Sequence, residues 1–163
     1  MNTNKIQTTW QVKHFSQLSL EQLYELLKLR IDIFVVEQTC YYPDLDSDKG
    51  QLDRHQDTLH LLGYQDNTLV TYLRILAKDQ SYKNYISIGR VATAKQARGK
   101  GLGHELLKKA LNLCEQHFPK QNIKISAQEH LIGYYQQHGF KQVSPMYLED
   151  NIPHVAMVKN SDS

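Results

Sequence analysis

The chain has 163 residues, of which 40% are hydrophobic and 22% charged, a composition typical of one globular domain. The formal net charge of +2 is too small to indicate a nucleic-acid or membrane-surface partner. No apolar run is long enough to span a membrane, and Met1–Thr9 lacks the apolar core of a signal peptide. We therefore expect a single domain over residues 1–163, located in the cytoplasm, with flexible ends at residues 1–9 and 160–163.

The two cysteines agree with a reducing compartment. Cys114 lies on the apolar stripe of a predicted helix and is expected to be buried, whereas Cys40 follows the start of a polar loop, which leaves an exposed position open. Both are interpreted as free thiols and not as a disulfide.

The first predicted elements are a strand and a helix. Trp10–Phe15 alternates as a strand does. Ser19 and Gln22 have the spacing of a capping box, which predicts a helix that begins there. Apolar residues then recur at helical spacing for about four turns, and we interpret that stripe as core packing.

An acidic segment follows this helix. Its run Asp-x-Asp-x-Asp over 44–48 resembles the start of a calcium loop. However, Lys49 stands where an EF-hand requires glycine, and His55 stands where it requires glutamate. No metal site is predicted. The segment is either a solvated acidic loop or a patch that attracts a cationic amine.

Three strands are predicted next. Leu59–Gln65 and Thr68–Leu76 form a hairpin through the turn residues Asp66 and Asn67. Ile86–Thr93 has β-branched residues at alternating positions and predicts the third strand.

A glycine-rich, basic loop links this strand to a helix over Gly101–His117. The loop has glycines at three alternate positions and three basic side chains: Gly99, Gly101 and Gly103, with Lys95, Arg98 and Lys100. Glycine allows a ligand to approach the backbone closely, and a helix N-terminus favours an anion. The loop therefore predicts a cradle for a phosphate or pyrophosphate, although a glycine-rich hinge that binds nothing has the same pattern.

Two common phosphate motifs do not fit this loop. A P-loop requires Ser or Thr after its lysine, but Gly101 follows Lys100. The glycines also run G-x-G-x-G and not G-x-G-x-x-G. Instead, Gln96–Gly101 resembles the Gln/Arg-x-x-Gly-x-Gly/Ala loop of the Gcn5-related N-acetyltransferase (GNAT) superfamily, which binds the pyrophosphate of acetyl-CoA.

The rest of the chain predicts alternating strands and one short helix. We expect a strand over Ile123–Ala127, a helix over Leu131–His138 that ends at Gly139, and two closing strands, Val143–Leu148 and Val155–Lys159. Strands outnumber helices and helices stand between them, which indicates an α+β fold.

A second motif lies in this half of the chain. Tyr134–Phe140 resembles the aromatic-Tyr-x-x-x-Gly-Phe signature of the GNAT superfamily, in the order that the superfamily requires. A narrower resemblance, to the ElaA-like branch, spans Trp10–Lys159. It is carried by four segments: Leu29–Gln38, Tyr72–Leu76, Ile88–Val91 and Ile152–His154.

The resemblance implies a GNAT-type mixed, mostly antiparallel central sheet of six to seven strands flanked by about four helices. The sheet splays beside the strand before the glycine loop, and the pantetheine arm enters the gap. Acetyl-CoA is then the co-substrate, with no metal. The implied contacts are Val91, Ala92 and Thr93 to pantetheine, and Gln96, Ala97, Arg98, Gly99, Lys100, Gly101, Leu102 and Gly103 to the pyrophosphate. Tyr135 is also an implied cofactor contact.

The implied reaction is N-acetylation of a primary amine by direct attack on the thioester. An amine with a pKa of about 10.4 must lose a proton first. Candidate bases are Glu37, His60 and His154. For each of them, the alternative to catalysis is a purely structural role. Tyr135 corresponds to the tyrosine that protonates the departing thiolate in the superfamily, and its alternative is a core aromatic.

Three arginines, Arg30, Arg74 and Arg90, lie inside apolar segments. They either face solvent or, with Glu37, bind the substrate, because an Arg fork suits a carboxylate. Together with the acidic segment they suggest an amino acid or a peptide-like amine, bound by a monomer or homodimer. The alternatives are a non-catalytic acyl-CoA sensor, a transferase that uses another acyl-CoA or an O-nucleophile, and a nucleotide-binding protein.

Overall fold

The computed structural model describes residues 6–45 and 51–161. Within these residues it has three α-helices, α1 (Leu20–Arg30), α2 (Leu102–His117) and α3 (Ile132–Gln136). A π-helical segment, Ile31–Glu37, continues α1. The eight strands are β1 (Thr9–Lys13), β2 (Leu59–Gln65), β3 (Thr68–Leu76), β4 (Ser87–Thr93), β5 (Ile123–Gln128), β6 (Lys141–Gln142), β7 (Tyr147–Glu149) and β8 (Ile152–Lys159).

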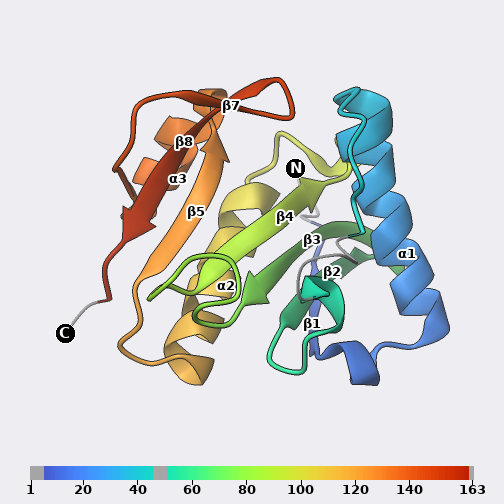
Figure 1. Cartoon of the computed structure of the whole chain (residues 1–163). Helices are drawn as coiled ribbons and strands as arrows, with labels where there is room; N and C mark the ends of the chain where they lie inside the picture. Colours follow the sequence, from blue (N-terminus) through green and yellow to red (C-terminus); the bar gives the residue numbers. More distant parts are fainter. Residues whose placement is uncertain (1–5, 46–50, 162–163) are drawn as a thin grey trace, which may run out of the picture.

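The strands form two sheets that meet at one point. The first has the order β1-β2-β3-β4, and in the second β5, β6 and β7 all pair with β8; every named pair is antiparallel. In the described residues, β4 and β5 are joined by a single parallel bridge between Ile86 and Ile123. Beyond that bridge the two strands diverge, as Figure 1 shows. The splayed, mostly antiparallel α+β fold is therefore confirmed.

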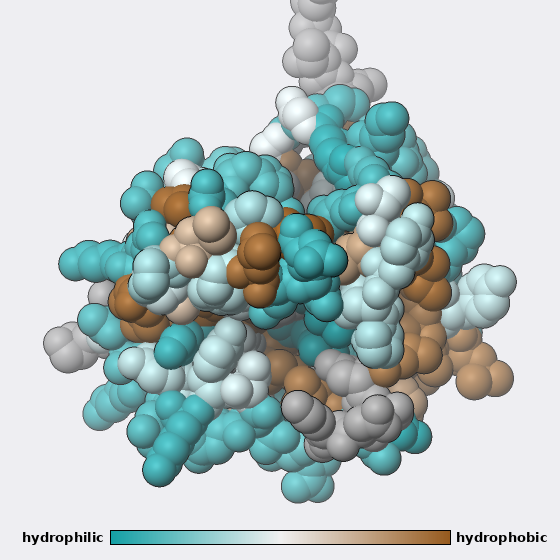
Figure 2. Space-filling model, turned by 45° about the horizontal axis from the view of Figure 1, so that its top comes forward, coloured by the Kyte–Doolittle hydropathy of each residue, from teal (hydrophilic) through white to brown (hydrophobic). Residues whose placement is uncertain are grey.

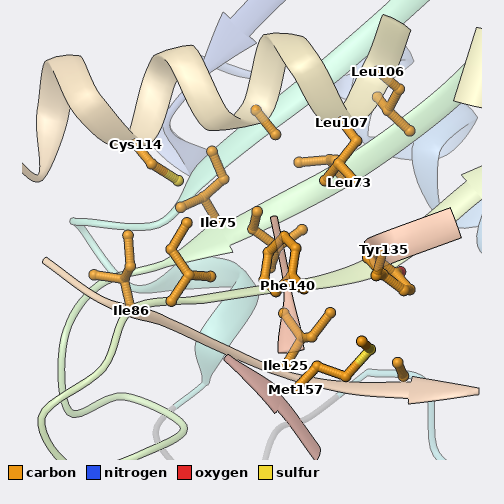
Figure 3. Packing of buried hydrophobic residues seen from close by; sticks show 14 of the residues in the cluster. Leu73, Ile75, Ile86, Leu106, Leu107, Cys114, Ile125, Tyr135, Phe140 and Met157 are labelled. Carbon is orange, nitrogen blue, oxygen red and sulfur yellow. The ribbon is translucent and has the colours of Figure 1, made fainter. Parts of the chain in front are cut away.

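Helices cover both faces of the sheets. In Figure 1, α1 lies in front, and α2 and α3 lie behind. Leu106 and Leu107 of α2 pack in one core with Ile75 of β3 and Phe140, as Figure 3 shows. Leu26 of α1 belongs to a second core on the other face. Three α-helices stand where about four were expected, because several helical turns are short 3-10 segments.

The local signals of the N-terminal half are confirmed. Ser19 Oγ accepts a hydrogen bond from the Gln22 amide (3.0 Å), and the Gln22 side chain accepts one from the Ser19 amide (3.1 Å), which completes the capping box. Asp66 and Asn67 have φ values of 49° and 62°, the left-handed pair that a tight hairpin requires.

Several boundary predictions are wrong. The first strand ends at Lys13 and not at Phe15, and the last begins at Ile152 and not at Val155. Val143–Leu148 is not one strand: Tyr147 and Leu148 belong to β7, the Val143 amide donates separately to the Ala156 carbonyl at 2.9 Å, and Pro145 between them has no N–H to donate. The first helix does not continue as an α-helix, because the Gln38 amide donates to the Ile33 carbonyl at 2.9 Å, five residues back. Such π-helical segments are frequent at functional sites.

Both cysteines are free and buried, so Cys40 does not take the exposed position that the sequence left open. Burial raises the pKa of the Cys114 thiol to about 12. Asp44, at the start of the acidic segment, is also buried, while Asp46 and Asp48 lie outside the described residues. The helices of the described part are all too short or too polar to cross a membrane.

Candidate active site

The strand before the glycine loop contains a β-bulge. Tyr72 pairs with Ala92 and Arg74 with Gly89, so β4 has one residue more than β3 between these pairs. Within this bulge Arg90 adopts φ +52°, a left-handed conformation that non-glycine residues rarely adopt. Such strain costs on the order of 1–3 kcal/mol and concentrates at functional sites. The bulge turns the Arg90 side chain towards a cavity that is described below.

A cavity of about 760 Å³, here called the loop cavity, lies where β4 and β5 diverge. Gly99 and Gly101 have φ values of +82° and +80°, and a Cβ at either position would meet no atom within 4 Å. The backbone of the loop therefore faces open space that a ligand could occupy. The predicted cofactor residues that line this cavity are Val91, Ala92, Thr93, Arg98, Gly99, Gly101, Leu102, Gly103 and Tyr135.

The other loop residues that were predicted to contact the pyrophosphate do not line the loop cavity. Ala97 is buried in the α1-side core, and Gln96 and Lys100 are exposed. Gln96 lines a different hollow beside α1.

Arg98 ties the glycine loop to two other elements. Its Nε donates to the Thr93 carbonyl at 2.9 Å, and its guanidinium binds both oxygens of Glu37, with Nη2 to Oε2 at 2.7 Å. The hydrogen bond from Arg98 lowers the pKa of Glu37. A carboxylate whose pKa is lowered, and which is already paired, takes up a proton poorly. This geometry favours a structural role for Glu37 over that of a base.

A second cavity of about 240 Å³, here called the bulge cavity, lies on the other side of the β4 bulge. Figure 2 looks at this end of the molecule, where the surface is hollowed in the middle. Six residues line both cavities: Gln38, Val91, Gln128, Leu131, Tyr135 and Ile152. The Gln128 side chain donates to that of Gln38 at 3.1 Å and so bridges β5 and the end of the π-helix. The two cavities thus meet beside Tyr135.

Tyr135 is buried at the boundary between the core and the cavities. Its ring packs edge-on against Tyr134 and Phe140, with centroid distances of 4.8 and 5.7 Å. Figure 3 shows Tyr135 at the edge of the α2-side core. Burial raises the pKa of its phenol well above the usual range, so the group stays protonated at neutral pH. Tyr135 is a core aromatic and a cavity residue at once.

The two candidate histidines differ in position. His60 is buried, lies within 2.7 Å of the Tyr72 hydroxyl and 2.8 Å of the Asp53 carbonyl, and is not among the residues that line either cavity. Burial lowers its pKa, so it is neutral. His154 lines the bulge cavity, with Nδ1 2.7 Å from the Ile152 carbonyl and Nε2 3.3 Å from Glu149 Oε2.

The three arginines form one ion-pair network with Asp44 and Asp53. Arg30 has no exposed side-chain surface and binds both carboxylates, at 2.9 and 2.8 Å. Arg74 binds Asp53 at 2.9 Å, and Arg90 binds Asp44 at 3.0 Å. Arg74 and Arg90 also line the bulge cavity, whereas Arg30 does not. Arg30 is therefore a buried member of the network that lines neither cavity.

Sequence reasoning missed several cavity residues. Gln38 lies at the end of a segment that resembles the ElaA-like branch but was not predicted as a site residue, and Gln128 and Glu149 belong to no motif. Glu149 instead ends β7 and lines the bulge cavity beside His154. Its position three residues before the Ile-Pro-His segment was the only signal available.

A split sheet, a bulged strand and an open glycine loop at a helix N-terminus define an acyl-CoA-dependent acyltransferase fold. Residues 34–161 match the family described as the acetyltransferase (GNAT) domain. The chain belongs to this GNAT acetyltransferase family, in its ElaA-like branch.

Relatives match the chain over nearly its whole length. Protein ElaA of Escherichia coli (strain K12) is 43% identical over 150 residues, which cover 92% of this chain and 95% of that protein. The crystal structure of an acyl-CoA N-acyltransferase from Pseudomonas aeruginosa has a TM-score of 0.87 at 42% identity, covering 94% of this chain and 99% of that one. The crystal structure of Escherichia coli ElaA has a TM-score of 0.86 at 41% identity, covering 94% and 100%.

Proposed function

We propose that this protein transfers an acetyl group from acetyl-CoA to a primary amine, which attacks the thioester directly. The observation that carries the proposal is that the loop cavity and the bulge cavity share Tyr135. An acyl donor in the first cavity and an acceptor in the second would meet beside a phenol that can donate a proton.

The donor would bind along the edge of β4. The backbone of Val91, Ala92 and Thr93 holds the pantetheine arm, because this edge is unpaired beyond the Ile86–Ile123 bridge in the described part of the chain. The pyrophosphate lies on the part of the loop from Arg98 to Gly103, where the N-terminus of α2 favours an anion.

His154 is our choice for the base. In the tautomer with the proton on Nδ1, that proton is donated to the Ile152 carbonyl and Nε2 has a lone pair to accept another. Glu149, 3.3 Å from Nε2, would stabilise the imidazolium that then forms. The amine gives a proton to His154 and its nitrogen bonds to the thioester carbon. The C–S bond then breaks, and Tyr135 donates its proton to the departing sulfur. The nitrogen releases its second proton to solvent, and the Tyr135 phenolate takes one back from solvent, which leaves the amide, the thiol and a neutral phenol. Glu37 and His60 fit this task less well, for the reasons given above.

We further propose that the acceptor is a small molecule or a peptide amine. The protein itself is a monomer or homodimer and is located in the cytoplasm. The two free thiols support a reducing compartment. Transfer from a longer acyl-CoA, or to an O-nucleophile, uses the same cavities and is tested by the same assay.

The test is thiol release from acetyl-CoA with a panel of amines, for the wild type and Tyr135→Phe. We expect kcat to fall by about 100-fold or more in the variant, while the Kd for acetyl-CoA, measured by calorimetry, changes less than about twofold. Tyr24→Phe is the matched control, because Tyr24 is exposed on α1. An unchanged kcat in Tyr135→Phe would remove the acid role. Tight acetyl-CoA binding without thiol release from any amine or alcohol would favour a sensor.

A further inference from the structure

Two histidines beside the loop cavity have no part in the reaction proposed above. His104 is the third residue of α2, and His138 lies two residues after the end of α3. Nδ1 of His104 is 2.8 Å from Nε2 of His138, and the two rings are stacked with their centroids 5.1 Å apart. These two residues, here called the histidine pair, join the first turn of α2 to the end of α3.

The histidine pair is held in place by its neighbours. The centroid of the Tyr134 ring lies 5.0 Å from that of His104 and 5.7 Å from that of His138. The Tyr134 hydroxyl donates a hydrogen bond to the carbonyl of Gly103, the residue before His104. The His138 amide donates to the Tyr135 carbonyl at 3.0 Å. The pair is therefore attached both to the glycine loop and to the tyrosine that lines both cavities.

His104 lies where a donor in the loop cavity would carry its phosphates. It lines this cavity together with Gly99, Gly101 and Gly103, and its side chain is exposed. It also belongs to the first turn of α2, whose free amides favour an anion. An imidazole at this position can add a charge-assisted hydrogen bond to those amides if it carries a proton.

The hydrogen bond within the pair limits the charge that the pair carries when the cavity is empty. One of the two facing nitrogens must accept this hydrogen bond, and a nitrogen that accepts has no proton. Burial lowers the pKa of His138, and His104 and Lys108 lower it further, so His138 is the neutral acceptor. His104 then donates from Nδ1, which leaves its Nε2 as the nitrogen that can take up a proton.

Other ionisable groups surround the pair. They are Glu105 and Lys108 on α2, Tyr134 on α3, and Arg98 and His130, which line the same cavity. Burial raises the pKa of Tyr134 to about 12, so its phenol stays protonated, and Arg98 is paired with Glu37. Of the groups named here, only the three histidines ordinarily titrate near neutral pH.

We propose that the histidine pair is a proton-coupled phosphate site of the donor cavity: His104 takes up a proton on Nε2 and donates it to a phosphate oxygen of the bound donor. This inference rests on the proposed function and adds two residues to its donor site. The proton comes from solvent and no covalent bond of the donor breaks. His138 is a positioning residue, because its Nε2 accepts from Nδ1 of His104 and so fixes which nitrogen faces the phosphate. Donor affinity should then rise as the pH falls, by at most about 10-fold per pH unit for one proton.

The test is calorimetry of CoA, dephospho-CoA and pantetheine at pH 6 and pH 8, with EDTA present. We expect the Kd for CoA to be at least about fivefold lower at pH 6, with proton uptake measured in buffers of different ionisation enthalpy. His104→Gln should reduce the change to less than about twofold and abolish that uptake. The 3′-phosphate of CoA has its own pKa of about 6, but its titration is common to the wild type and the variant. A dependence that dephospho-CoA retains identifies the pyrophosphate, and one that it loses identifies the 3′-phosphate; pantetheine should show none.

Further variants separate a positioning role from a structural one. His138→Phe cannot accept a hydrogen bond and should reduce the pH dependence, whereas His138→Gln can accept one and should restore part of it. His117→Gln is the control, because His117 is exposed at the other end of α2 and lines neither cavity. Circular dichroism of each variant reports whether the fold is kept.

Three outcomes would overturn the inference. They are a pH dependence that is equal in the wild type and His104→Gln, the loss of that dependence in His130→Gln, and the absence of proton uptake when the wild type binds CoA. The last needs no variant. Because calorimetry needs no catalysis, proton-coupled CoA binding without thiol release would support the histidine pair and count against the acetyltransferase proposal. Thiol release with no proton uptake on CoA binding would do the reverse.

Discussion

One carboxylate oxygen of Asp53 accepts hydrogen bonds from two guanidinium groups. Its Oδ1 accepts from Nη1 of Arg30 and from Nη1 of Arg74, at 2.8 and 2.9 Å. Removing one charge from a buried pair leaves its partners uncompensated, which costs roughly 3–5 kcal/mol. We therefore expect Asp53→Asn to lower the free energy of unfolding by about 3 kcal/mol in urea titrations. Asp57→Asn, at an exposed position, should change it by less than about 0.5 kcal/mol.

The same residue predicts a pH dependence. Burial opposes ionisation of Asp53, but Arg30 and Arg74 outweigh it and lower the pKa to about 2. Because the folded-state pKa lies below the unfolded value, this stabilisation is fully present above about pH 4 and is lost as the pH falls to about 2. It amounts to about 2 kcal/mol. Asp53→Asn should lack this part of the acid transition; a transition identical to that of the wild type would contradict the pairing.

At this scale the sequence indicated where one residue, Tyr135, would lie, but it did not indicate which residues form pairs. The position of Tyr135 followed from a motif, and it lines both cavities. In contrast, Arg30 and Asp53 are separated by 23 residues, and nothing in the local pattern of either one indicates the other. Their pairing depends on how α1 packs on the sheet, which is a tertiary property.

At the scale of elements, the glycine loop offers a test of the donor site. Gly101 has φ +80° and precedes α2, and its Cα faces open space. Asparagine tolerates this conformation but carries a side chain into that space. We expect Gly101→Asn to fold with a loss of about 1 kcal/mol or less and to raise the Kd for acetyl-CoA by about 10-fold or more. Lys120→Asn, at another left-handed position away from both cavities, is the control. Unchanged affinity in Gly101→Asn would remove the loop from the donor site.

Elements with strong local signals were predictable. The bounds of β2 and β3 agree with the prediction, because alternating strands and a two-residue turn specify a hairpin locally. The bulge at Arg90 was not predictable, since an extra residue in one strand appears only when its partner is known. The π-helix after α1 was missed because its apolar stripe has nearly the period of an α-helix.

At the scale of the whole molecule, we expect bound acetyl-CoA to contact both sheets and to stabilise them against separation. It would fill the gap between β4 and β5, which a single bridge spans in the described residues. A ligand at 100 times its Kd stabilises a protein by about 2.7 kcal/mol, or roughly 5–10 °C in Tm for a chain of this length. Hydrogen exchange should show the added protection concentrated at residues 87–93 and 99–103. Equal protection at β1 and β2 would indicate that the ligand binds elsewhere.

The pairing order of the strands has a consequence for synthesis. Strands β1 to β4 each pair with a neighbour in sequence, whereas β5, β6 and β7 all depend on β8, which follows them in the chain. Once β1 to β4 have emerged from the ribosome, every strand of the first sheet has its pairing partners present. The second sheet has no ladder until Ile152–Lys159 emerges, and His154 comes with it. During translation we therefore expect the sheet that holds the glycine loop to pair its strands first, and the second sheet to assemble only when its last strand arrives.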